Sequence, residues 1–135
     1  MPTAYWCVLI AATLPYVWTV IAKSGGNQRF DNRDPRAWLA RQEAPRVVRA
    51  NAAQLNAFEA FAPFAAGVVL AQLAAVDAGL VSLLAIAFVA CRVLHGVFYV
   101  TGRATLRSLA WAGGFACVLW LLAAAALRVG ATGPG

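Results

Sequence analysis

Three polar residues, Arg49, Asn56 and Glu59, lead into a long apolar segment of this 135-residue chain. On a helix, offsets of 7 and 10 residues place all three side chains on one face, and Pro63 follows on the same stripe. An ionised carboxylate inside a bilayer needs a partner, a water-filled recess or a proton. The stripe therefore predicts a binding site for a small, polar, charged molecule at the edge of a membrane.

A second polar group, Arg92, His95 and Tyr99, lies in another apolar segment and also shares one helix face. The sequence 77–79 between the two segments allows only a tight antiparallel hairpin. At ~1.5 Å per residue, Glu59 lies roughly 27 Å from that turn, His95 roughly 24 Å and Arg92 roughly 20 Å. We therefore expect both groups to form one binding layer, with Arg92 just beneath it. The alternative is a buried salt-bridge layer that only fixes the register of the helices.

The elements that must position these residues are membrane helices. Hydrophobic residues make up 62% of the chain and charged residues only 12%, so the bilayer is the expected solvent. Four segments have the ~20 residues that a helical span needs. They are Ala4–Ala22, Ala57–Val76, Leu80–Val100 and Leu109–Leu127. We expect an all-α integral membrane four-helix bundle in which residues 1–135 form one domain and 23–48 a long loop.

Basic residues are concentrated in the first and third loops, whereas the second loop has none, and most of the net charge of +6 reflects this asymmetry. The positive-inside rule therefore predicts a cell-membrane protein with loops one and three in the cytoplasm and both termini outside. The first span lacks a preceding basic residue, which favours a retained anchor over a signal peptide. The arginines indicate contact with anionic lipid, and nothing in the sequence points to nucleic-acid binding.

The sequence offers no second set of reactive groups. Cys7, Cys91 and Cys117 are scattered through the apolar spans without the spacing of metal ligands, so we interpret them as small packing residues. His95 has no nearby ligands of the usual kind, and we expect no metal site.

The first loop is predicted to contain a short helix. Asp34 followed by Pro35 is typical of a helix start, with an aspartate cap and proline at the first helical position. Trp38 and Leu39 between arginines suggest an amphipathic segment at the lipid headgroups. Pro45 then begins the helix that carries the polar stripe.

Three stretches of this chain resemble the MAPEG family, the membrane-associated proteins in eicosanoid and glutathione metabolism. In the second helix the stretch runs from Arg49 through Asn56 and Glu59 to Pro63-Phe64, and the others are 92–99 and 104–111. The likeness covers nearly the whole chain, and is greatest to the short bacterial members of unassigned activity. It implies a homotrimer of four-helix subunits that binds glutathione between neighbouring subunits near the cytoplasmic face.

The resemblance also implies roles for individual residues. Asn56 and Glu59 match the family's glutathione-contacting asparagine and glutamate, and Tyr99 matches a tyrosine of the third helix. Arg107 stands where the family's transferases have an arginine that stabilises the glutathione thiolate, and Arg103 is the second choice for that role. A nearby cation would lower the thiol pKa and populate the nucleophilic thiolate.

Two positions depart from the family's pattern. Ala52 stands where the characterised enzymes have an arginine, one helical turn before Asn56, and His95 stands where several members have a tyrosine. These departures bear on glutathione binding and catalysis rather than on the fold.

Three functions are compatible with these patterns. The first is a glutathione-dependent transferase or peroxidase that acts on hydrophobic electrophiles dissolved in the bilayer. The second is a non-catalytic MAPEG-fold protein that binds a small polar ligand or a partner. The third is a small multidrug-type transporter, which the position of Glu59 among Asn and Arg residues near a cytoplasmic boundary disfavours.

Overall fold

The computed structural model describes residues 2–132, and all regular secondary structure in that range is helical, with no strand among the described residues. Four of its helices are long and apolar enough to cross a membrane, which confirms the predicted fold class. The fifth, α2, is a short helix in the first loop. The helices are α1 (Pro2–Ser24), α2 (Pro35–Ala40), α3 (Pro45–Leu73), α4 (Ala78–Val100) and α5 (Ala104–Thr132).

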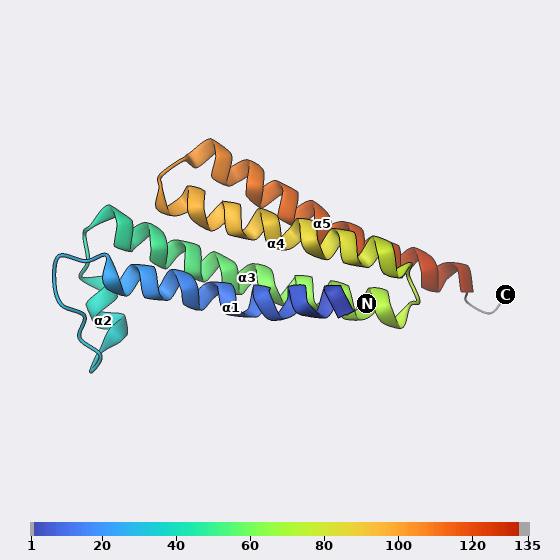
Figure 1. The fold of residues 1–135 in the computed structure, drawn as a ribbon, viewed down its shortest axis with the longest axis horizontal. Coiled ribbons are helices and arrows are strands. Elements are labelled where there is room, and N and C mark those ends of the chain that lie inside the picture. Colours follow the sequence, from blue (N-terminus) through green and yellow to red (C-terminus); the bar gives the residue numbers. More distant parts are fainter. Residues whose placement is uncertain (1, 133–135) are drawn as a thin grey trace.

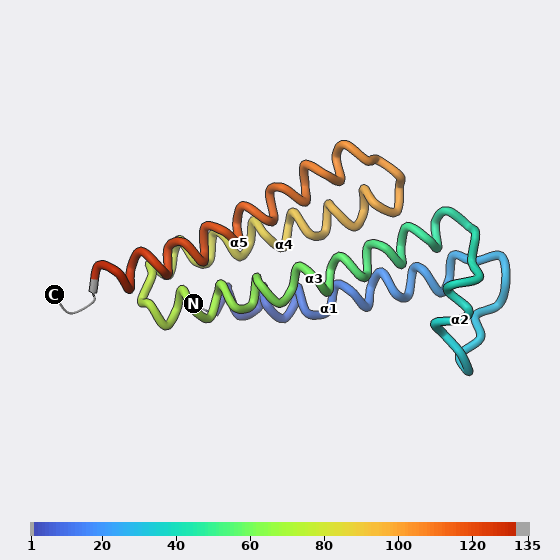
Figure 2. The backbone as a smooth tube through the Cα atoms, turned by 180° about the vertical axis from the view of Figure 1, so that it is seen from behind, coloured from blue at the N-terminus to red at the C-terminus, as the bar shows by residue number. Residues whose placement is uncertain are grey.

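The four long helices run alternately up and down, as Figures 1 and 2 show. Helices α3 and α4 occupy the middle of the bundle: α1 packs mainly on α3, and α5 packs mainly on α4. The first loop and the α4–α5 turn lie at one end, while the α3–α4 turn and both ends of the described chain lie towards the other (Figure 1). The predicted pairing of loops one and three on one side is therefore present.

The core between α3, α4 and α5 is made of aromatic and branched side chains. Phe64 and Phe88 are fully buried and stack face to face, with ring centroids 3.9 Å apart and planes 10° from parallel. Gly67 allows α5 to approach, because a Cβ atom at this position would lie 3.2 Å from Cβ of Leu121. These contacts hold the three helices that carry the polar residues in one register.

A tryptophan from α1 fills the bundle closer to the first loop. Trp18 is buried with Ala53 and Ala57 of α3, and its ring lies directly on Gly96 of α4. Small residues at such contacts let membrane helices approach closely. The Trp18–Gly96 contact therefore sets the distance between α1 and α4 beside the polar layer.

The first loop is folded on the ends of α1 and α3. Asp34 caps α2 as expected, since its side chain accepts a hydrogen bond from the Ala37 N–H at 3.2 Å. Trp38 is buried, packs on Phe30 and donates its indole N–H to the Arg29 carbonyl at 3.0 Å. The Trp38 side chain therefore faces the interior of the loop, where the indole is buried with a satisfied N–H. The position of this segment at the lipid headgroups stays a prediction.

The turn after α3 contains the one non-glycine residue with positive φ among the described residues, Ala75 at φ 53°. The Val76 N–H bonds to the Ala71 carbonyl and the Ala75 N–H bonds to the Gln72 carbonyl, which is the Schellman pattern. Helix α3 therefore ends at Leu73 rather than at the predicted Val76. The left-handed conformation satisfies the last carbonyls but is unfavourable for alanine.

We expect Ala75→Gly to stabilise the protein by about 0.5–1 kcal/mol, because glycine adopts positive φ without the steric cost of a Cβ atom. Thermal unfolding in detergent measures the effect. The matched control is Ala74→Gly, since Ala74 has an ordinary φ of −77° and glycine there adds only flexibility. Equal or greater stabilisation by the control would contradict the explanation.

Candidate functional site

Two charged or titratable side chains are buried in the middle of the bundle, Arg92 at 4% and His95 at 3% exposure. Both come from α4, one helical turn apart. The Arg92 Nη2 group donates to Asn56 Oδ1 of α3 at 2.5 Å and lies 3.3 Å from His95 Nδ1. Because a guanidinium can only donate, His95 Nδ1 acts as the acceptor, which assigns the proton of a neutral imidazole to Nε2.

The predicted depth of this layer needs one correction. We expected Asn56 beside His95 with Arg92 beneath, but Asn56 bonds directly to Arg92. The reason is that α3 ends earlier than predicted, which leaves Asn56 roughly 26 Å from the end of its helix and Arg92 roughly 21 Å from the start of its own. The long arginine side chain spans the remaining difference.

The polar contacts continue from His95 towards the α4–α5 turn. The rings of His95 and Tyr99 meet edge to face, with centroids 5.5 Å apart. The guanidinium carbon of Arg107, on α5, lies 4.6 Å from the centroid of the Tyr99 ring, a cation–π geometry. Asn56, Arg92, His95, Tyr99 and Arg107 thus form one continuous series of contacts across three helices.

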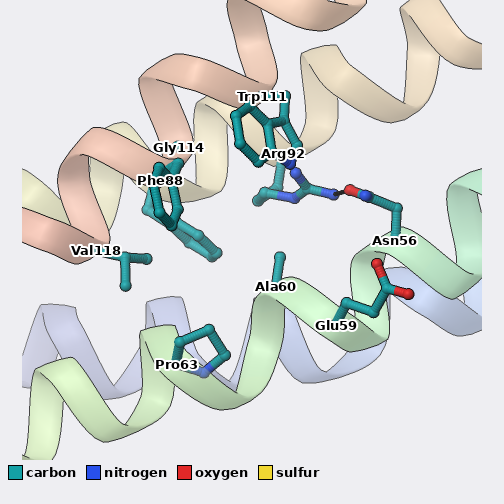
Figure 3. Close-up of a pocket in the computed structure, with 10 residues that line it drawn as sticks. Asn56, Glu59, Ala60, Pro63, Phe88, Arg92, Trp111, Gly114 and Val118 are labelled. Carbon is teal, nitrogen blue, oxygen red and sulfur yellow. Dashed lines mark hydrogen bonds between the residues drawn. The ribbon is translucent and has the colours of Figure 1, made fainter.

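A recess of about 200 Å³ opens beside this series between α3, α4 and α5. Figure 3 shows that its polar side chains come from one end, while its walls towards the α3–α4 turn are apolar. The Nε atom of Arg92 is buried and has no hydrogen-bond partner among the described residues. The lining residues are Asn56, Glu59, Ala60, Pro63, Phe88, Arg92, Trp111, Gly114, Phe115 and Val118.

Glu59 lines the same recess and is exposed in the structure. Among residues 2–132 it forms no ion pair, and the partners of Arg92 are Asn56 and His95 instead. The recess therefore presents a guanidinium and a carboxylate that are not paired with each other. Such an arrangement can hold a molecule that carries both a carboxylate and an amino group.

Five of the predicted site residues do not line the recess. His95, Tyr99 and Arg107 belong to the series of contacts beside it, whereas Arg49 and Arg103 do not. Arg49 is exposed and reaches the α4–α5 turn, where its Nη1 atom lies 2.5 Å from the position that a Cβ atom of Gly102 would occupy. Gly102 has φ 75°, so the turn and the arginine both favour glycine there. Arg103 is exposed immediately after that turn. Binding roles for these two arginines stay predictions.

The sequence interpretation missed the wall that α5 contributes. Trp111, Phe115 and Val118 line the recess together with Gly114. Their offsets of 3, 4 and 7 residues from Trp111 are those of one helix face, so this spacing was available as a signal. It is weak in this segment, because α5 is apolar on its other faces as well.

The family model described as the MAPEG family matches residues 3–127. The matched range contains the whole polar layer and every residue that lines the recess. No curated protein and no solved structure gives a significant match to the chain.

Proposed function

The chain belongs to the MAPEG family as a multi-pass membrane protein, and we propose that it is a glutathione-dependent transferase or peroxidase acting on hydrophobic electrophiles. The observation that carries this proposal is the recess between α3, α4 and α5. It combines the guanidinium of Arg92, the carboxylate of Glu59 and apolar walls in one site. A polar thiol peptide and an apolar electrophile need these two environments side by side.

The charges of the recess suggest how glutathione binds. Arg92, which lines the recess, pairs with a carboxylate of the peptide through its guanidinium. Glu59 accepts from the peptide's amino group, and Asn56, already bonded to Arg92, supplies an amide at the same level. His95 holds the guanidinium through Nδ1 and acts as a positioning residue.

Arg107 is the proposed stabiliser of the glutathione thiolate, with Arg103 as the second choice. Arg107 lies in the first turn of α5, where the positive end of the helix dipole adds to its charge. Its contact with the Tyr99 ring holds the guanidinium near the polar layer. A cation and a helix N-terminus together favour the thiolate over the thiol.

Assembly and orientation are part of the same proposal. The recess is open on one side and Glu59 is exposed within the subunit, and a neighbouring subunit in a homotrimer would cover both. The first loop and the α4–α5 turn, which together with the adjoining helix ends carry most of the arginines, are proposed to face the cytoplasm. Glutathione would then enter from the cytoplasmic side, and the electrophile from the bilayer.

The deciding experiment titrates the purified protein with glutathione and follows the ultraviolet absorbance of the thiolate. We expect saturable binding with a thiolate signal in the wild type. Arg107→Ala should remove that signal and lower conjugation at least about tenfold, because an opposite charge shifts a thiol pKa by about one unit or more. Binding through Asn56 and Glu59 should weaken less. Full activity of the variant would reject the role of Arg107, and absence of glutathione binding in the wild type would reject the enzyme.

A non-catalytic binding protein is the second candidate, and one observation favours it. Arg107 contacts Tyr99 and is not among the residues that line the recess. Ala52 also replaces the arginine that the resemblance places one turn before Asn56. Binding of glutathione without a thiolate signal would support this candidate.

A further inference from the structure

Two of the three cysteines lie where α4 and α5 pack against each other. Cys91 on α4 and Cys117 on α5 are free thiols and are half-buried, whereas Cys7 is buried on α1. The thiol of Cys91 acts electrostatically on that of Cys117, so the two groups lie near each other. The fold therefore pairs two residues that belong to separate spans.

Glycines of α5 make room for Cys91. A Cβ atom at Gly113 would lie 3.0 Å from Sγ of Cys91, and one at Gly114 would lie 3.5 Å from its Cβ atom. Small residues at such a contact let two membrane helices approach closely. Cys117 follows Gly113 by one helical turn and shares its face of α5. The Cys117 side chain therefore begins beside the surface on which the Cys91 thiol rests.

A disulfide forms only between cysteines whose Cα atoms lie within about 7 Å and whose side chains point towards each other. We propose that the close approach of α4 and α5 at Gly113 brings Cys91 and Cys117 into this range, so that they form an intramolecular disulfide under oxidation. The pair is a redox-sensitive modification site. It does not depend on the proposed glutathione chemistry, because neither cysteine lines the recess.

The oxidant that reaches this pair is an organic hydroperoxide dissolved in the bilayer, since Cys117 packs against the apolar core. One thiol attacks the terminal peroxide oxygen and the O–O bond breaks, which gives a sulfenic acid and an alcohol. The second thiol attacks the sulfenic sulfur, forms the S–S bond and releases the oxygen as water. The two thiols lose two electrons and two protons, and the hydroperoxide takes up both.

The disulfide joins two helices that form walls of the recess. Arg92 directly follows Cys91 and Val118 directly follows Cys117, and both line the recess. The bond also closes a covalent loop through the α4–α5 turn, which restricts the unfolded chain. Oxidation is therefore expected to hold α4 and α5 together and to make the protein more resistant to heat.

The test treats the purified protein with cumene hydroperoxide, then alkylates the remaining thiols after unfolding and measures the intact mass. We expect the wild type to lose two of its three free thiols, and dithiothreitol to restore both. The melting temperature should rise by about 5 °C or more on oxidation. Cys91→Ala and Cys117→Ala should each form no disulfide and show no rise. Cys7→Ala is the matched control and should still lose both of its remaining thiols.

Peptide mass spectrometry of the oxidised wild type should identify Cys91 linked to Cys117. This measurement needs no variant, so it decides the inference even if an alanine substitution prevents folding. Non-reducing gel electrophoresis distinguishes a bond within one chain from a bond between two chains. Three free thiols after treatment, a disulfide that contains Cys7, or a bond between chains would overturn the inference.

Discussion

Arg92→Met is expected to lower the affinity for glutathione about 30-fold or more while the protein remains folded. Removing one member of a buried, hydrogen-bonded charge pair costs about 2–5 kcal/mol of binding free energy. Arg92 is the group to which we assign the carboxylate of the peptide, and its Nε has no partner inside the protein. The loss should therefore fall on binding rather than on packing.

The free energy of unfolding of Arg92→Met should stay within about 2 kcal/mol of the wild type. Burying a guanidinium is itself costly, and methionine fills a similar volume without that cost. Against this gain, Asn56 Oδ1 and His95 Nδ1 each lose a donor. These two effects on the free energy of unfolding oppose each other. We therefore expect the variant to fold but to lack the positive charge that binds the peptide's carboxylate.

Calorimetric titration with glutathione and thermal unfolding in detergent measure these two quantities on the same samples. Arg36→Met is the matched control, since Arg36 is an exposed arginine of the first loop and should leave both unchanged. The glutathione affinity of Arg92→Lys should lie between those of the wild type and Arg92→Met, because lysine keeps the positive charge but lacks the planar guanidinium that binds a carboxylate through two hydrogen bonds. Wild-type affinity in Arg92→Met would show that the recess does not hold the peptide's carboxylate.

Gly96→Ala is expected to destabilise the protein by about 3 kcal/mol or more. A Cβ atom at Gly96 would lie 2.0 Å from Cζ2 and 2.3 Å from Cε2 of Trp18. Trp18 is buried among Ala53 and Ala57, so its rigid ring has no free space into which to turn. Overpacking of a dense interior costs about 1–3 kcal/mol, and a contact this close lies at or beyond the upper end.

Gly130→Ala is the matched control for this prediction, because Gly130 is also helical and a Cβ atom there meets nothing within 4 Å. Alanine is the better helix former, so the control should be neutral or stabilising by up to about 1 kcal/mol. Trp18→Leu combined with Gly96→Ala should recover part of the loss, since the smaller side chain removes the clash. A single Gly96→Ala variant as stable as the control would contradict the close contact between α1 and α4.

The sequence alone determined the four long apolar helices and the two ends at which their connections lie. A bilayer leaves the backbone no hydrogen-bond partners outside the helix, so long apolar segments can only be helices. The sequence also determined the meeting of α3 and α4 at Asn56 and Arg92, to within one helical turn, because the short turn between them fixes their register. The start of α2 at Asp34-Pro35 followed from local capping chemistry.

Only the tertiary structure decided which faces of the helices meet. Lipid-facing and protein-facing residues are similarly apolar in these spans. The sequence pattern therefore does not predict which face of each helix packs against its neighbours. For this reason the recess wall of Trp111 and Phe115, and the contact of Trp18 with Gly96, appeared only in the fold. The burial of Trp38 and the position of Ala75 at positive φ depend likewise on neighbours that are brought together by packing rather than by sequence spacing.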